Sequence, residues 1–392
     1  MRNSGTIAHW QGFGFDGKTR TSMCARRVAE LLTLAGITVN GRQPWDPQVH
    51  NDRFFQRMLT AGTLGAGEAY MDGWWDVEAL DELFVRLERA QLHKRFGRLM
   101  TFLPALKGRM VNLQTLVRAK HVAERHYNLG NDLYQAMLGQ HMQYSCAYWP
   151  GAETLDQAQE NKLHLICRKL GLQPGMRLLD VGGGFGSLSR FAAKEYGCEV
   201  VAYNISRAQV AYAREVCRGL PVRVEEKDYR LAVNEPHKFD RIVSVGFFEH
   251  VGHKNYQAFL ELVRGCLKDE GLFLLHTIGG NELHTSTDPW IDKYIFANGV
   301  IPSMTQLAGA MEGRWVVEDW HNFGPDYDRT LMSWWRNFED AWPKLRSKYD
   351  DRFYRMWKYY LLTSAGAFRA RTLQLWQVVL SKGDVAAYRS VR

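Results

Sequence analysis

An acid followed by closely spaced glycines is the feature with the clearest chemical potential: residues 180–186 read Asp-Val-Gly-Gly-Gly-Phe-Gly. Glycine tolerates positive φ, and its missing Cβ lets a ligand approach the backbone. Compared with the dinucleotide fingerprint G-x-G-x-x-G, the third glycine comes one residue early, and Asp180 precedes Gly182 and Gly184. A pyrophosphate disfavours an acid there, whereas a ligand with a sulfonium, an ammonium and no phosphate does not. The turn therefore points to S-adenosylmethionine, with a nicotinamide cofactor or a ligand-free turn as the alternatives.

Three more positions follow expected strands. Asn204 comes just after the second strand and could take ribose hydroxyls, and Asp228 comes just after the third and could accept from an adenine amino group. A turn former and a helix cap are the alternative interpretations of these two residues. The long aromatic segment 281–303 follows the fifth strand. Segments of that length in compact domains are usually lids or binding loops.

The elements that must position these residues are short apolar runs that alternate with helical patterns, which is typical of a doubly wound α/β sheet. In such a sheet, ligands bind outside the carboxyl ends of the strands. Ser206 is expected to cap the helix after the second strand. The expected strands cover 176–181, 198–203, 222–226, 240–245, 272–276 and a final one at 375–380.

The positive charge of the chain is concentrated in one stretch. The whole chain carries 50 Lys and Arg against 42 Asp and Glu, which gives +8. Residues 86–125 alone carry ten basic against two acidic side chains, interleaved with apolar residues. A basic amphipathic stretch suits an anionic membrane surface. A solvated helical face, a linker and a nucleic-acid site are the alternatives, and we expect no nucleic-acid partner.

Several classes of protein are disfavoured by composition. No run of about 18 apolar residues predicts a membrane span, and the N-terminus has no apolar h-region, so we expect no secretion. The six cysteines show no C-x-x-C spacing, which argues against structural zinc and against a disulfide framework. We expect no metal site and a reducing cytoplasm.

Composition divides the chain into four parts. Residues 1–27 form an N-terminal extension, and 28–90 form a small, mainly helical domain for membrane docking or dimerisation. Residues 91–120 are a basic linker, and 121–392 are the catalytic domain.

Long motifs carry a family resemblance from about Val28 to the C-terminus. The sequence resembles the cyclopropane-fatty-acyl-phospholipid synthases, in the mycolic acid cyclopropane synthase family. The resemblance implies a mostly parallel, seven-stranded, Rossmann-like methyltransferase sheet with a small helical N-terminal domain. The motifs that carry it lie at 65–75, 126–132, 143–149, 248–252, 275–279, 288–296, 320–327 and 366–371.

The resemblance implies transfer of a methylene group from S-adenosylmethionine to the cis double bond of an acyl chain in a membrane phospholipid. It also implies a carbocation intermediate and a bound bicarbonate as the base. The bicarbonate cage maps onto Cys146, Glu249, His276, the backbone of Ile278 and Tyr327. Glu249 is expected to end the fourth strand and His276 the fifth. Cys146 by itself could instead be a buried apolar residue or a catalytic thiolate.

The resemblance adds Tyr127, Tyr144, Ser145 and Gln209 to the residues expected to touch the cofactor. Relatives often have tryptophan where this chain has Phe185, and some have cysteine where it has Ser364. Because Phe185 still offers a ring, we expect cofactor binding to be kept, and serine at 364 argues against a covalent role there.

The implied partner is a phospholipid bilayer with unsaturated, anionic lipids, at the inner face of the cytoplasmic membrane. Family members are often homodimers, although no interface can be read from the sequence. Three other functions remain open at this point. They are a methyltransferase that makes methyl-branched acyl chains, a non-catalytic lipid-binding protein and a nicotinamide-dependent oxidoreductase.

Overall fold

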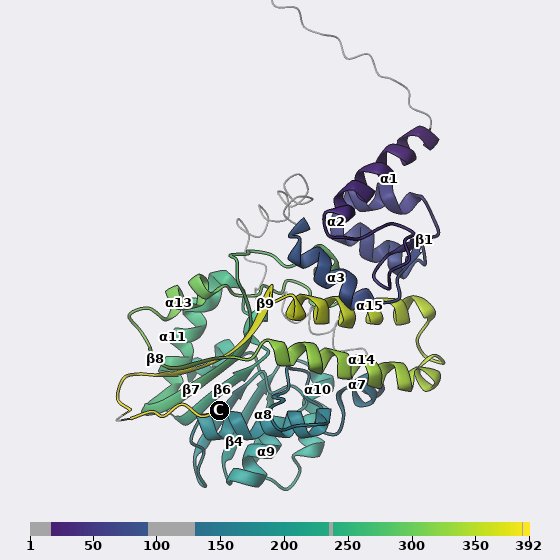
Figure 1. The fold of residues 1–392 in the computed structure, drawn as a ribbon. Coiled ribbons are helices and arrows are strands. Elements are labelled where there is room, and N and C mark those ends of the chain that lie inside the picture. Colours follow the sequence, from purple (N-terminus) through teal and green to yellow (C-terminus); the bar gives the residue numbers. More distant parts are fainter. Residues whose placement is uncertain (1–16, 93–129, 235–237, 386) are drawn as a thin grey trace, which may run out of the picture.

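The computed structural model describes residues 17–92, 130–234, 238–385 and 387–392. Tyr127, the expected linker at 91–120 from residue 93 onward, and most of the basic stretch 86–125 lie outside these ranges. Figure 1 shows an α/β layer at the bottom and a helical N-terminal region at the top, with two long helices, α14 (Pro325–Leu345) and α15 (Asp351–Arg369), between them.

A seven-stranded sheet forms the centre of the α/β layer, as the family resemblance implies, and its strand order is β5-β4-β3-β6-β7-β9-β8. The five strands β3, β4, β5, β6 and β7 run parallel to one another, and β9 is antiparallel to both of its neighbours, β7 and β8. The sheet is therefore mostly parallel. Its strands are β3 (Arg177–Val181), β4 (Glu199–Asn204), β5 (Val222–Glu226), β6 (Phe239–Val245), β7 (Leu267–Gly280), β8 (Val316–Asn322) and β9 (Leu373–Ser381).

Helices connect these strands, and side-chain hydrogen bonds at their N-termini determine where two of them begin. Ser206 caps α10 by accepting a hydrogen bond from the Gln209 backbone N–H, as expected. Thr154 and Gln157 form a reciprocal capping box at the start of α8. Together with these two, the helices from residue 131 to residue 311 are α7 (Asn131–Leu138), α8 (Leu155–Lys169), α9 (Ser187–Tyr196), α10 (Arg207–Val216), α11 (Tyr256–Cys266), α12 (Pro289–Tyr294) and α13 (Met304–Met311).

Two expected positions at strand ends are wrong. Strand β7 begins directly after α11, at Leu267, and continues to Gly280, so it extends beyond both ends of the expected 272–276. His276 therefore lies inside β7, opposite Gln377 of β9. Glu249 does not end β6, which stops at Val245. It lies in the short 3-10 helix η2 (Phe248–His250).

The N-terminal region is mainly helical, as expected, and contains α1 (Gly17–Thr33), α2 (Arg53–Met71) and α3 (Leu80–Arg89). The expected boundary between residues 27 and 28 falls inside α1. A small antiparallel pair, β1 (Gln48–Val49) with β2 (Trp75–Asp76), closes the region. Its apolar side chains belong to the same continuous core as those of α14 and α15.

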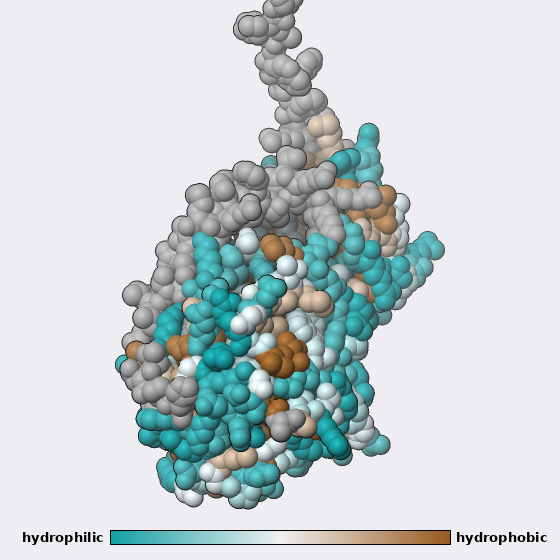
Figure 2. Space-filling view, turned by 90° about the vertical axis from the view of Figure 1, so that its left-hand side faces the viewer, coloured by the Kyte–Doolittle hydropathy of each residue, from teal (hydrophilic) through white to brown (hydrophobic). Residues whose placement is uncertain are grey.

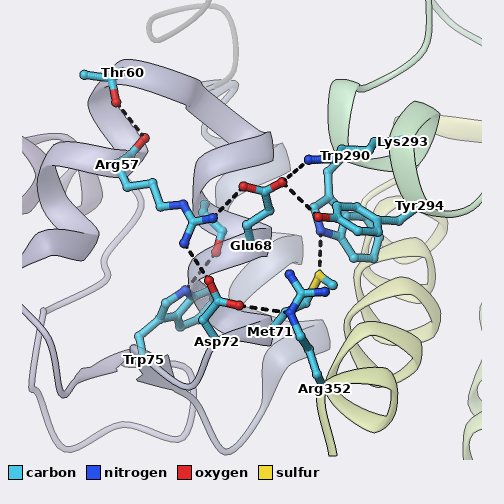
Figure 3. Close-up of polar contacts among 11 residues, drawn as sticks. Arg57, Thr60, Glu68, Met71, Asp72, Trp75, Trp290, Lys293, Tyr294 and Arg352 are labelled. Atoms are coloured by element: carbon cyan, nitrogen blue, oxygen red, sulfur yellow. Dashed lines mark hydrogen bonds and ion pairs between the residues drawn. The ribbon is translucent and has the colours of Figure 1, made fainter. Parts of the chain in front are cut away.

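A polar cluster ties this region to α12 and α15 (Figure 3). Glu68 of α2 accepts hydrogen bonds from Arg57 at 2.6 Å, from Lys293 Nζ at 2.5 Å and from the Tyr294 hydroxyl at 2.9 Å. Burial opposes its ionisation, but Lys293, Arg57 and Tyr294 outweigh burial and lower the pKa of Glu68 to about 2. Helix α12 is thus attached to the N-terminal region by a carboxylate that stays ionised.

Among the described residues, no helix is long and apolar enough to cross a membrane. The face shown in Figure 2 is mostly hydrophilic, with separate hydrophobic patches.

Candidate active site

A cavity opens where β3, β4 and β6 end and the glycine turn begins, the edge at which this class of sheet places its ligands. Every described residue that was expected to touch the cofactor lines it. These are Tyr144, Ser145, Asp180, Gly182, Gly184, Asn204, Gln209 and Asp228.

The glycine turn needs its glycines for two reasons. Gly182 has φ +81° and Gly184 has φ +53°, and L side chains rarely adopt such values. A Cβ on Gly182 would also lie 2.7 Å from the ring of Phe247. The ring of Phe185 is buried against Tyr134 and Tyr212, and Phe185 is also one of the residues that line the cavity.

Asp180 is buried beneath the cavity. Burial raises its pKa to about 6, although the Ser189 hydroxyl donates to its Oδ2 at 2.7 Å and favours the ionised form. The ammonium group of a bound ligand would place a positive charge beside this carboxylate and so favour its ionised form. Asp180 therefore fits the role predicted for it.

Asn204 and Asp228 make internal hydrogen bonds. The Asn204 amide donates to the Gly184 carbonyl and to Gln209 Oε1, and its oxygen accepts from the Ser206 N–H. Its two N–H donors are occupied, so in this structure it holds the turn and Gln209 in place. Asp228 accepts from the backbone and the guanidinium of Arg230. Contacts of Asn204 with ribose and of Asp228 with adenine remain predictions.

Glu249 and His276, two of the residues expected to hold the base, are not among the residues that line the cavity. The Ile278 N–H donates to Glu249 Oε1 at 2.7 Å, so the Ile278 backbone is engaged in holding Glu249. The Gln377 amide nitrogen lies 3.2 Å from His276 Nδ1. With that amide donating to Nδ1, the neutral ring carries its proton on Nε2. Glu249 Oε2 and His276 Nε2 are both buried and have no hydrogen-bond partner among the described residues.

Burial sets the charge of both groups. It raises the pKa of Glu249 to about 7, against the hydrogen bond from the Ile278 N–H. It lowers the pKa of His276 well below the ordinary value, and the charges of Lys162 and Lys169 act in the same direction. His276 is therefore neutral at pH 7, while Glu249 titrates near neutrality.

Cys146 is fully buried, and its thiol lies 3.2 Å from the Ala147 carbonyl. Burial, and then the charge of Asp326, raise the pKa of Cys146 well above the ordinary value. The thiolate is therefore disfavoured at neutral pH. Burial likewise raises the pKa of Tyr327, so this phenol keeps its proton.

Aromatic rings connect the cavity to Tyr327. Tyr144, which lines the cavity, packs on Trp334 with ring centroids 5.3 Å apart, and Trp334 meets Tyr327 edge-on at 5.9 Å. The Tyr144 hydroxyl donates to the Tyr360 hydroxyl at 2.9 Å. Phe296, also on the cavity wall, lies 5.9 Å from the Tyr360 ring. The result is a wall that presents ring faces and edges and few polar groups.

Sequence reasoning missed several lining residues. Phe247 and His250 follow β6, and the signal that could have found them is their place at a strand's carboxyl end. The expected loop at 281–303 does contribute to the cavity through 296–298, but it also contains α12.

Backbone contacts connect that loop to Glu249. Asp292 Oδ1 of α12 accepts from the Asn298 N–H at 2.7 Å. The Val300 N–H then donates to the Glu249 carbonyl at 2.8 Å. The loop therefore runs from the Glu68 cluster, past the cavity, to the residue expected to hold the base.

Comparison with known proteins identifies the family. The sequence model of the mycolic acid cyclopropane synthetase family matches residues 114–378. The chain belongs to this family. It is 51% identical over 368 residues to the cyclopropane-fatty-acyl-phospholipid synthase of Escherichia coli strain K12, covering 93% of this chain and 96% of that protein.

Solved structures agree with this assignment. The cyclopropane synthase MmaA2 from Mycobacterium tuberculosis superposes with a TM-score of 0.63 at 30% identity, over 67% of this chain and 98% of that one. The mycolic acid cyclopropane synthase CmaA1, complexed with SAH and CTAB, gives 0.61 at 31% identity, over 67% and 98%. The chain is accordingly an enzyme, a methyltransferase that uses S-adenosylmethionine.

Proposed function

We propose that this enzyme transfers a methylene group from S-adenosylmethionine to the cis double bond of an unsaturated acyl chain in membrane phospholipid. The products are a cyclopropane acyl chain and S-adenosylhomocysteine. The 51% identity to a cyclopropane-fatty-acyl-phospholipid synthase over nearly the full length of both chains supports this reaction most strongly. The observation that carries the mechanism is the pair of buried, unpartnered atoms Glu249 Oε2 and His276 Nε2. Glu249 is close enough to Tyr327 for its charge to act on the pKa of that phenol.

The reaction needs a dry, aromatic site. A carbon–carbon bond forms from the alkene to the methyl carbon as its bond to sulfur breaks, which leaves a carbocation on the acyl chain. Aromatic faces stabilise a cation by about 0.5–1 kcal/mol at exposed sites and by about 2 kcal/mol or more when water is excluded. Tyr144, Trp334 and Tyr327 form the wall that would provide this. Loss of a proton from the new methyl group then closes the ring.

The cage residues fit a bicarbonate ion. An anion that has one O–H and further oxygens needs both acceptors and donors from its site. Glu249 Oε2 is a buried acceptor and the neutral His276 Nε2–H is a buried donor, and neither has another partner among the described residues. When bound, bicarbonate would supply the base for the proton of the new methyl group. Glu249 and His276 would orient the ion, Tyr327 would donate to it and Cys146 would border it. Ile278 takes part through its N–H, which holds Glu249.

The substrate requires contact with a bilayer. We propose that the enzyme binds the inner face of the cytoplasmic membrane peripherally, and that the basic stretch 86–125 supplies the attraction to anionic lipids. Co-sedimentation with vesicles of increasing anionic content at several salt concentrations tests this. Binding that ignores both lipid charge and salt would contradict it.

The decisive experiment incubates the purified protein with S-adenosylmethionine and vesicles of unsaturated phospholipid. Release of S-adenosylhomocysteine and mass analysis of the fatty acids are measured together. A cyclopropane product has two fewer hydrogens than a methyl-branched saturated chain, so the spectrum separates the two reactions. No S-adenosylhomocysteine and unchanged olefins would refute the proposed function.

Two substitutions test the cage within that assay. Glu249→Gln replaces the unpartnered Oε2 by an amide nitrogen, and His276→Ala removes the unpartnered Nε2 together with the Nδ1 that Gln377 contacts. Both variants should keep the fold and abolish turnover. Glu261→Gln, at a half-exposed carboxylate on α11, is the matched control and should keep the wild-type rate. If both cage variants turn over like the control, bicarbonate is not held here.

A further inference from the structure

Helix α8 carries a fully buried lysine directly behind the cavity wall. Lys162 has 0% exposure, and its Nζ donates to Gln143 Oε1 at 2.5 Å and to Ser145 Oγ at 2.7 Å. Both acceptors line the cavity. From the same helix, the Gln159 amide donates to the carbonyls of residues 143 and 145. The wall segment 143–145 is thus held by α8 through its side chains and its backbone.

The hydrogen bonds of Lys162 match those of a neutral amine. An –NH₂ group donates two hydrogens, and the described residues offer Nζ two acceptors, neither of them ionised. An ammonium has three donors, so one would lack an acceptor among these contacts. Burial lowers the pKa of Lys162 to about 7, although Cys146 and Asp180 act in the opposite direction. The amine can therefore change its charge near neutral pH.

We propose that Lys162 is a positioning residue that holds the 143–145 wall as a neutral amine and lets the site distinguish the sulfonium of S-adenosylmethionine from neutral S-adenosylhomocysteine. This inference rests on the proposed function. A protonated Lys162 places a positive charge one side chain behind the wall, where it repels a sulfonium but not a thioether. Deprotonation removes that repulsion. The substrate then gains affinity relative to the product as the pH rises through neutrality.

The other titratable groups around Lys162 do not produce the same effect. Cys146 keeps its proton, and burial lowers the pKa of both His276 and His141, so these rings are neutral near pH 7. Asp180 has a pKa of about 6 and does titrate in this range. However, the amino group that Asp180 would attract is common to both ligands. The ratio of the two affinities therefore isolates the charge on sulfur. Glu249 also titrates near pH 7, and its carboxylate would attract a sulfonium. The part of the pH dependence that belongs to Lys162 is therefore the part that Lys162→Met removes.

The test measures dissociation constants for S-adenosylmethionine and S-adenosylhomocysteine by calorimetry from pH 6 to pH 8. In the wild type, the affinity ratio of substrate to product should rise about tenfold over this range. Lys162→Met keeps the length and removes the charge, so its ratio should change less with pH than that of the wild type. Lys169→Met is the matched control, because Lys169 is also 0% exposed on α8 but is paired with Asp319 at 2.9 Å. Its ratio should follow the wild type.

A measurement on the wild type alone covers the case in which Lys162→Met does not fold. Titrations at pH 6.5 in two buffers of different ionisation enthalpy count the protons released on binding. S-adenosylmethionine should release about half a proton or more beyond what S-adenosylhomocysteine releases. Equal release, or a Lys162→Met ratio that rises with pH like the wild type, would overturn the proposal. No binding of either ligand to the wild type would instead refute the proposed function.

Discussion

Replacing Glu249 by glutamine should make the protein more stable at alkaline pH while it abolishes turnover. In the folded chain the pKa of Glu249 is raised from 4.5 to about 7 by burial. A carboxyl group whose pKa is raised on folding favours the folded state below its unfolded pKa. It loses that contribution as the pH rises through the folded pKa. Above pH 7 the native protein therefore carries a buried carboxylate at a cost that the unfolded chain does not have.

The size of this effect follows from the shift. The difference between about 7 and 4.5 corresponds to about 3 kcal/mol at pH 8.5. Glutamine keeps an oxygen that can accept from the Ile278 N–H, as Glu249 Oε1 does at 2.7 Å. Its amide nitrogen replaces the unpartnered Oε2, which costs about 1–2 kcal/mol. We expect a net gain in the free energy of unfolding of about 1–2 kcal/mol at pH 8.5 and none at pH 5.

Urea unfolding of the wild type, Glu249→Gln and the control Glu261→Gln at pH 5 and pH 8.5 measures this difference. The buffers must be free of carbonate, because a bound anion would stabilise the wild type. Adding bicarbonate should then raise the midpoint of the wild type but not that of Glu249→Gln. If Glu249→Gln is no more stable relative to the wild type at pH 8.5 than at pH 5, the assignment of Glu249 as a buried acid with a raised pKa is wrong.

Three further substitutions test other parts of the site. Cys146→Ser should keep turnover within about tenfold of the wild type, because burial disfavours the thiolate; a loss of about a thousandfold in the steady-state rate would instead indicate a nucleophilic thiol. Asp180→Asn should weaken binding of S-adenosylmethionine about tenfold or more in calorimetry, since a charged hydrogen bond contributes about 1.5–3 kcal/mol, and unchanged affinity would exclude Asp180 from the cofactor site. Glu68→Gln should lower the free energy of unfolding at pH 7 by about 2–3 kcal/mol, because the depressed pKa of Glu68 gives stability above its unfolded pKa of 4.5 that is lost as the pH falls towards 2. A deficit that is as large at pH 4 as at pH 7 would contradict this account.

The fold and the cofactor edge could be predicted because their signals are local. The glycines after Asp180 fix a turn by their backbone alone, and the alternation of apolar runs with helical patterns indicates that the first strands are parallel. Strand ends were less predictable. The length of β7 depends on its pairing with β9, about a hundred residues later, so a local pattern could not show that His276 lies inside the strand.

The occupation of hydrogen-bonding groups could not be predicted from the sequence either. The sequence suggests Asn204 as a ligand for ribose, but only the fold shows that both its N–H donors are taken. In the helical pattern of α8, Lys162 looks like any solvated lysine. Its role follows from the wall segment 143–145, which a separate part of the chain places beside it. Partners of this kind are set by tertiary contacts and not by spacing.

The attachment of α12 to Glu68 has a consequence for engineering. A path of contacts runs from Glu68 through Lys293, Asp292, Asn298 and Val300 to Glu249. It connects the first ninety residues to the residue that we propose holds the base. The N-terminal region and the rest of the chain therefore cannot be exchanged independently of each other. In a chimaera that exchanges residues 17–92 for those of another synthase, α12 and the cavity residues 296–298 keep their attachment only if the donor supplies a carboxylate at the position of Glu68.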